Sequence, residues 1–87
     1  MQLRPRYIKI DKHFTQEIET DEGKEAIVRN IIAIAKDRGC LTIAEGVESA
    51  SQREKLVAMG VSFLQGYFFS RPIKAAVFFD KLQHSTL

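Results

Sequence analysis

The stretch Leu41-Thr-Ile-Ala-Glu-Gly-Val-Glu-Ser-Ala-Ser-Gln52 contains the junction between a strand and a helix. Its first part, residues 41–44, is a short and largely apolar run of the kind found in buried strands. Ser49 is followed three residues later by a glutamine, which is the form of a capping box that starts a helix. The stretch therefore predicts a strand that leads into a helix, with two carboxylates, Glu45 and Glu48, in the connection.

The same alternation of strand and helix continues on both sides of this stretch. Further strand patterns cover 7–10 and 61–64, where β-branched and aromatic residues gather. Helical patterns cover about 22–38, the segment from the Ser49 cap to Gly60, and about 74–82. Alternating elements with short connections predict parallel strands joined by right-handed crossovers.

The helix predicted at 22–38 carries one apolar stripe. Ile27, Ile31, Ile34 and Ala35 recur at helical spacing. We therefore expect these side chains to form the face that covers the sheet.

The predicted fold class is α/β, with three βα units in one small domain. The units cover about 6–39, 40–60 and 61–82, and residues 83–87 form a tail. Three strands are too few to close a barrel, and a parallel sheet needs cover on both faces. A lone sheet of this size leaves much apolar surface exposed. We therefore expect these units to belong to a larger architecture.

Composition and charge exclude several classes of function. The net charge of +2 comes from scattered Lys and Arg, with no basic run of the kind that binds nucleic acid. No apolar stretch approaches the about 20 residues that span a membrane. The single Cys40 has no partner for a disulfide within the chain, which favours a reducing, cytoplasmic location.

Polar side chains stand at the predicted carboxyl end of each strand. They are Lys9 and Asp11 on the first strand, Glu45 and Glu48 after the second, and Gln65 with Tyr67 after the third. In βα barrels this end carries the chemistry, so we expect these groups to share one mouth. Simpler roles stay open, because Asp11 can cap a short helix, Glu48 can serve as a first-turn acid, and Lys9 can face solvent on an edge strand.

Three motifs at these positions resemble the closing motifs of the EAL domain, which hydrolyses the bacterial second messenger cyclic di-GMP. They are Tyr7-Ile-Lys-Ile-Asp11, Ala44-Glu-Gly-Val-Glu48, and Gln65-Gly-Tyr67 with Ser70-Arg-Pro72. The resemblance runs from about Leu3 to Leu82. It implies a partial (β/α)8 barrel of the TIM type, of which this chain supplies the last three βα units.

The resemblance also implies a two-metal hydrolysis of cyclic di-GMP to linear pGpG, with Mg²⁺ or Mn²⁺ as the ions. By that resemblance Lys9, Glu45 and Gln65 are catalytic positions. Glu45 binds a metal, Gln65 orients a metal-bound water, and Lys9 bonds the attacking water. Binding and supporting positions follow in the same way: Tyr67, Arg71 and Pro72 line the guanine end of the site, and Asp11 and Glu48 support it.

Most of the family's metal ligands, including the Glu-Ala-Leu motif and an Asp-Asp pair, have no counterpart in this sequence. We therefore expect the isolated chain to be inactive. Two alternatives stay open. The chain is either an interaction or regulatory module that forms a homodimer or pairs with another EAL segment, or it retains weak binding of cyclic di-GMP.

Overall fold

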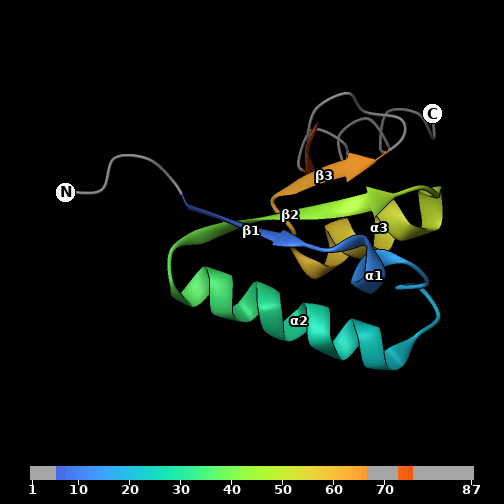
Figure 1. Cartoon of the computed structure of the whole chain (residues 1–87), viewed down its shortest axis with the longest axis horizontal. Helices are drawn as coiled ribbons and strands as arrows, with labels where there is room; N and C mark the ends of the chain where they lie inside the picture. Colours follow the sequence, from blue (N-terminus) through green and yellow to red (C-terminus); the bar gives the residue numbers. More distant parts are fainter. Residues whose placement is uncertain (1–5, 67–72, 76–87) are drawn as a thin grey trace.

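The fold is a four-stranded sheet in the order β1-β2-β3-β4, with helices between its strands (Figure 1). This computed structural model describes residues 6–66 and 73–75. Along the chain the elements are β1 (Arg6–Ile10), α1 (Lys12–Thr15), α2 (Glu22–Asp37), β2 (Cys40–Val47), α3 (Ala50–Met59), β3 (Phe63–Gly66) and β4 (Ile73–Lys74).

The first three strands are parallel neighbours in chain order, as predicted. Ile10 pairs with Ala44, and Ala44 pairs with Leu64, so these three side chains share one face of the sheet. On that face they form a buried core with Val28 of α2 and Leu56 of α3. Both helices therefore cover the same face. This is the arrangement of a barrel segment, whereas doubly wound folds carry helices on both faces.

Local signals set the ends of α2 and α3. The side chain of Asp21 accepts the backbone N–H of Lys24 at 3.1 Å and caps α2. Ser49 and Gln52 form the predicted capping box at the start of α3, and Gly60 ends that helix. The strand ends differ more from the predicted strands at 41–44 and 61–64, because β2 runs to Val47 and β3 begins at residue 63.

The third predicted helix was expected to begin at about residue 74, and Ala75 is indeed helical. Lys74 pairs antiparallel with Phe63, in the short strand β4. The backbone N–H of Ala75 then donates to the carbonyl of Ser62 at 3.0 Å. A helix that begins at Ala75 is compatible with this bond, because the first N–H groups of a helix have no partner within the helix. The rest of the predicted helix lies outside the described residues.

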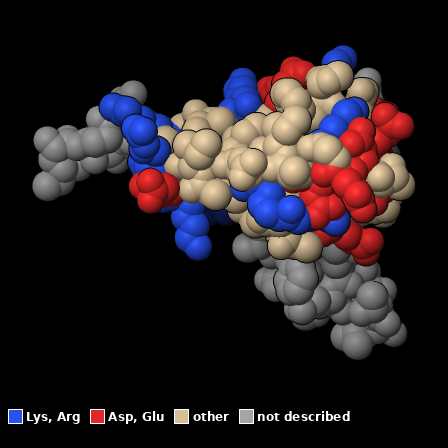
Figure 2. Space-filling model, turned by 90° about the horizontal axis from the view of Figure 1, so that it is seen from below, with Lys and Arg blue, Asp and Glu red and all other residues tan. Residues whose placement is uncertain are grey.

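The predicted apolar stripe of α2 is partly wrong. Ala35 is buried and Ile31 packs against the core, as predicted, whereas Ile27 and Ile34 are 44% and 57% exposed. Val28, which the predicted stripe left out, is buried. The helix is rotated so that Val28 and Ala35 face the sheet, and the two exposed isoleucines lie on its flank. Figure 2 views the molecule from the side of α2 and shows an uncharged band between mainly basic residues at one end and mainly acidic residues at the other. Within the described residues, no helix is long and apolar enough to span a membrane.

Candidate functional site

Two of the predicted site residues come together at the carboxyl ends of neighbouring strands. The ammonium nitrogen of Lys9 in β1 lies 3.9 Å from a carboxylate oxygen of Glu45 in β2. The Lys9 side chain is 65% exposed and that of Glu45 is 32% exposed. Lys9 thus faces solvent and is paired at the same time. An exposed pair of this kind adds little to stability, because water screens it. Its charges remain accessible to a ligand.

A β-bulge shapes the backbone at Glu45. Ala44 pairs with Leu64 and Val47 pairs with Gly66, so Glu45 and Gly46 together stand opposite the single residue between those two partners, Gln65. The φ angle of Gly46 is +68°, in the left-handed region that favours glycine. Such a bulge bends the strand and redirects the side chain beside it. The bulge brings the Glu45 and Gln65 positions opposite each other at the same end of the sheet.

Two glycines at the bulge, Gly46 in β2 and Gly66 in β3, are required by close packing. A Cβ atom on Gly46 would lie 2.3 Å from the Cβ of Lys12. A Cβ atom on Gly66 would lie 1.9 Å from the carbonyl oxygen of Val47. Side chains at either position would push α1 or the end of β2 away from the bulge.

Two buried polar residues, Thr15 and Gln52, hold the backbone between the bulge and the start of α3. The Thr15 hydroxyl donates to the carbonyl oxygen of Glu45 at 2.5 Å. The amide nitrogen of Gln52 donates to the carbonyl of Thr15 at 2.8 Å. The amide oxygen of Gln52 accepts the backbone N–H groups of Glu48 and Ser49 at 2.8 and 2.9 Å. Because Thr15 is 0% and Gln52 5% exposed, these bonds are shielded from water and hold the backbone from Glu45 to Ser49 in one shape.

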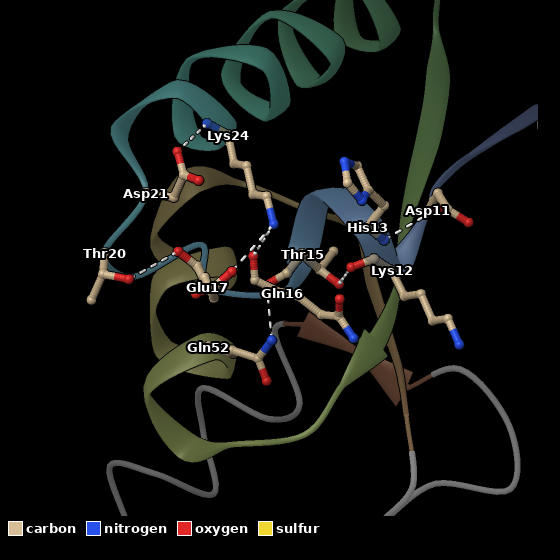
Figure 3. A network of polar contacts seen from close by, with 10 residues as sticks. All are labelled: Asp11, Lys12, His13, Thr15, Gln16, Glu17, Thr20, Asp21, Lys24 and Gln52. Atoms are coloured by element: carbon tan, nitrogen blue, oxygen red, sulfur yellow. Dashed lines mark hydrogen bonds and ion pairs between the residues drawn. The ribbon is translucent and has the colours of Figure 1, made fainter.

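The segment between α1 and α2 is tied down by Lys24 (Figure 3). Its ammonium donates to the carbonyl of Gln16 at 3.1 Å and lies 3.7 Å from the Glu17 carboxylate. Figure 3 shows Gln52 reaching toward the same segment from α3. These contacts keep Thr15 under Glu45. Sequence reasoning did not single out Thr15, and it treated Gln52 only as a cap. The capping box was the available signal for Gln52, and no local signal marked Thr15.

Gln65 presents an unpaired acceptor. Its amide oxygen is buried and has no hydrogen-bond partner among the described residues. A buried oxygen without a partner is costly, by about 1–3 kcal/mol, so this atom is suited to accept from a bound water.

The oxygens of Glu45 and Gln65 are ligands of the type that Mg²⁺ and Mn²⁺ take. Among residues 6–66 and 73–75, however, no group of three or more His, Cys, Asp or Glu side chains is placed to hold a metal. The described residues therefore supply some ligands of a metal site, from Glu45 and Gln65, but not a complete set.

The remaining predicted positions divide into two groups. The carboxylate of Asp11 accepts the backbone N–H of His13 at 3.0 Å, so Asp11 caps α1, as the simpler interpretation held. Glu48 has an exposed side chain, and its backbone N–H belongs to the Gln52 network. Tyr67, Arg71 and Pro72 lie outside the described residues.

Comparisons with known proteins agree on one family. The family model for the EAL domain matches residues 1–72. The chain is 41% identical over 75 residues to the cyclic di-GMP phosphodiesterase PdeL of Escherichia coli K12. The matched stretch covers 86% of this chain and 21% of PdeL.

Two solved structures share the fold. One is a standalone EAL protein from Vibrio cholerae O395 in its c-di-GMP-bound form, with a TM-score of 0.71, 31% identity, and coverage of 80% of this chain and 30% of that one. The other is BlrP1 from Klebsiella pneumoniae in its manganese and cy-diGMP complex, with a TM-score of 0.72, 33% identity, and coverage of 83% and 18%. The present chain thus spans less than a third of each of these proteins.

Proposed function

Because the chain belongs to the EAL domain family, we propose that it supplies one wall of a cyclic di-GMP phosphodiesterase site, whose product is linear pGpG. The observation that carries the proposal is the approach of Lys9 to within 3.9 Å of Glu45, beside the bulge opposite Gln65. These two side chains and an amide oxygen without a partner among the described residues lie at the carboxyl ends of parallel strands. A cation, a carboxylate and such an oxygen suit the hydrolysis of a phosphodiester. The lone Cys40 favours the cytoplasm as the compartment of this reaction.

Two divalent ions, Mg²⁺ or Mn²⁺, supply an activated water and offset phosphate charge when they are bound. The residues of this chain then have distinct tasks. Glu45 provides a carboxylate oxygen to an ion. Lys9 donates a hydrogen bond to the attacking water and balances negative charge beside Glu45. Gln65 orients a water through its buried amide oxygen. Tyr67, Arg71 and Pro72 line the guanine end, and Asp11 and Glu48 support the loops.

We expect the isolated chain to be inactive. Two ions carry four positive charges, and Glu45 is the only carboxylate of the described residues that we assign to them. A site with so few anionic ligands leaves the ions poorly held. The other ligands must come from the rest of an EAL barrel.

The proposal is tested in a chimera in which this chain replaces the matching segment of PdeL. We expect hydrolysis of cyclic di-GMP with Mg²⁺ or Mn²⁺. The variants Glu45→Gln and Lys9→Met should each lose at least about a hundredfold in kcat, as expected for groups that act on the reacting atoms. Glu54→Gln, an exposed change on α3, is the control. Full activity in Glu45→Gln would refute the assignment. Turnover by the isolated chain, lost in Glu45→Ala, would refute its expected inactivity.

A second candidate function is that of an interaction module. It is favoured by the three large hydrophobic side chains exposed on the described surface, Tyr7, Ile27 and Ile34, which all lie on β1 or α2. The molar mass of the chain in solution tests it. A monomer at all concentrations, with no partner among EAL segments, would contradict it.

A further inference from the structure

The backbone carbonyl of Glu45 lies where the strand ladders stop. The pairing of β1 with β2 ends at Ile10 and Ala44. On the side of β3, the bulge places Glu45 between the paired residues Ala44 and Val47. Within the described residues, Glu45 therefore has no paired residue in either neighbouring strand. Its carbonyl oxygen instead accepts the hydroxyl of Thr15 at 2.5 Å. A buried side chain thus supplies the hydrogen bond that a partner strand would otherwise provide.

Thr15 also joins Glu45 to the strand that carries Lys9. α1 follows β1 directly after Asp11, so the helix that ends at Thr15 is attached to the end of that strand. From α3, the side chain of Gln52 fixes Thr15 as well, because its amide nitrogen donates to the Thr15 carbonyl at 2.8 Å (Figure 3). The Thr15 hydroxyl is therefore held from two sides against the backbone of Glu45, whose carboxylate lies 3.9 Å from the Lys9 ammonium.

We propose that Thr15 is a positioning residue of this site: its hydroxyl fixes the peptide group of Glu45 and thereby the direction in which the Glu45 carboxylate is presented beside Lys9. The inference rests on the proposed function, in which Glu45 binds a divalent ion. A rotation of that peptide group turns the side chain of the same residue, so the carboxylate oxygen would leave the place of a ligand. Loss of a hydrogen bond that orients a metal ligand typically weakens metal binding or activity by about 10–100-fold.

A purely structural role for Thr15 makes a different prediction, and Thr42 separates the two roles. Thr15 is 0% and Thr42 2% exposed, and each hydroxyl bonds a backbone group. The Thr42 hydroxyl accepts the backbone N–H of Ser62 at 3.0 Å, in the amino-terminal half of β2. Replacing either threonine by valine keeps the side-chain volume and removes one buried hydrogen bond. Both changes should lower stability, but only the change at Thr15 removes a bond to the backbone of Glu45.

The test measures Mn²⁺ binding by calorimetric titration of the PdeL chimera that carries this chain, without substrate. Thr15→Val should weaken Mn²⁺ binding by about tenfold or more, because the Glu45 carbonyl loses its partner. Thr15→Ser keeps the hydroxyl and should bind Mn²⁺ as the wild type does. Thr42→Val should do the same, even where its Tm falls as far as that of Thr15→Val. In turnover, the Mn²⁺ concentration for half-maximal hydrolysis of cyclic di-GMP should rise by the same factor only in Thr15→Val.

A second measurement needs neither metal nor activity. The NMR signal of the Glu45 carbonyl carbon in the isolated, isotope-labelled chain should shift in Thr15→Val, because this carbonyl no longer accepts the hydroxyl. The signal should stay in place in Thr15→Ser and Thr42→Val. Circular dichroism checks that each variant is folded. Should valine unfold the chain at position 15, Thr15→Ala compared with Thr42→Ala answers the same question.

Each outcome bears on Thr15 separately from the proposed reaction. Mn²⁺ affinity of Thr15→Val equal to that of the wild type would overturn the proposal, as would an equal loss in Thr42→Val or an unchanged Glu45 carbonyl signal. If the wild-type chimera binds Mn²⁺ and does not hydrolyse cyclic di-GMP, the proposed reaction fails, while the titration still decides the role of Thr15.

Discussion

Gln52→Leu is the most informative single perturbation of the turn that carries Glu45. The change keeps side-chain volume but removes three hydrogen bonds, to Glu48, Ser49 and Thr15, at 2.8–2.9 Å. A net contribution of about 0.5–1.5 kcal/mol per bond gives, for three bonds, a loss of about 1.5–4.5 kcal/mol in the free energy of unfolding. The buried position of Gln52, at 5% exposure, prevents water from replacing these partners.

Thermal unfolding followed by circular dichroism measures this loss. About 4–8 °C per kcal/mol for a domain of this size converts it to a fall in Tm of roughly 6–36 °C. Gln52→Glu should fall between the wild type and Gln52→Leu, because it keeps an acceptor for the N–H groups of Glu48 and Ser49 and loses only the donor. Glu54→Gln serves as the surface control and should change the free energy by less than about 0.5 kcal/mol.

Amide exchange adds a local readout. The N–H groups of Glu48 and Ser49 should exchange much faster in Gln52→Leu than in the wild type, because both lose their acceptor. The reasoning would be refuted if Gln52→Leu melted together with Glu54→Gln, or if exchange at those two amides did not change.

Three further outcomes are expected. Gly46→Ala should be less stable than Gly39→Ala by about 1–3 kcal/mol in urea unfolding, because both have a φ of +68° but only Gly46 would clash, at 2.3 Å from Lys12; equal losses would show that the clash relaxes freely. Ion pairs, first with Lys55 and then with Arg29, hold the pKa of Glu25 below its usual value of 4.5, so Glu25→Gln should lower Tm at pH 7, and the difference should fade as pH falls below 4.5; a difference that stays constant down to pH 3 would contradict this. Titration of the isolated chain with cyclic di-GMP should produce no measurable heat at high micromolar ligand, and a saturable isotherm would instead establish binding without the rest of the barrel.

Local chemistry in the sequence determined much of the fold. The capping box at Ser49 and Gln52 involves backbone groups within one helical turn, so it was readable without any tertiary information. The order of strands and helices followed from short periodic patterns, and the parallel pairing of β1, β2 and β3 agrees with it. The motifs around Lys9, Glu45 and Gln65 likewise indicated the family that the comparisons identified.

The tertiary structure decided what depends on residues far apart in the chain. Thr15 and Gln52 are 37 positions apart, and their bond forms only because α1 and α3 both pack beside the end of β2. The bulge at Glu45 is a relation between β2 and β3, so no pattern within β2 could show it. The exposure of Ile27 likewise depends on tertiary packing. Helical periodicity places apolar residues on a stripe, but the packing of α2 against the sheet determines which edge of that stripe is buried, because only one part of a helix surface can contact the strands beneath it.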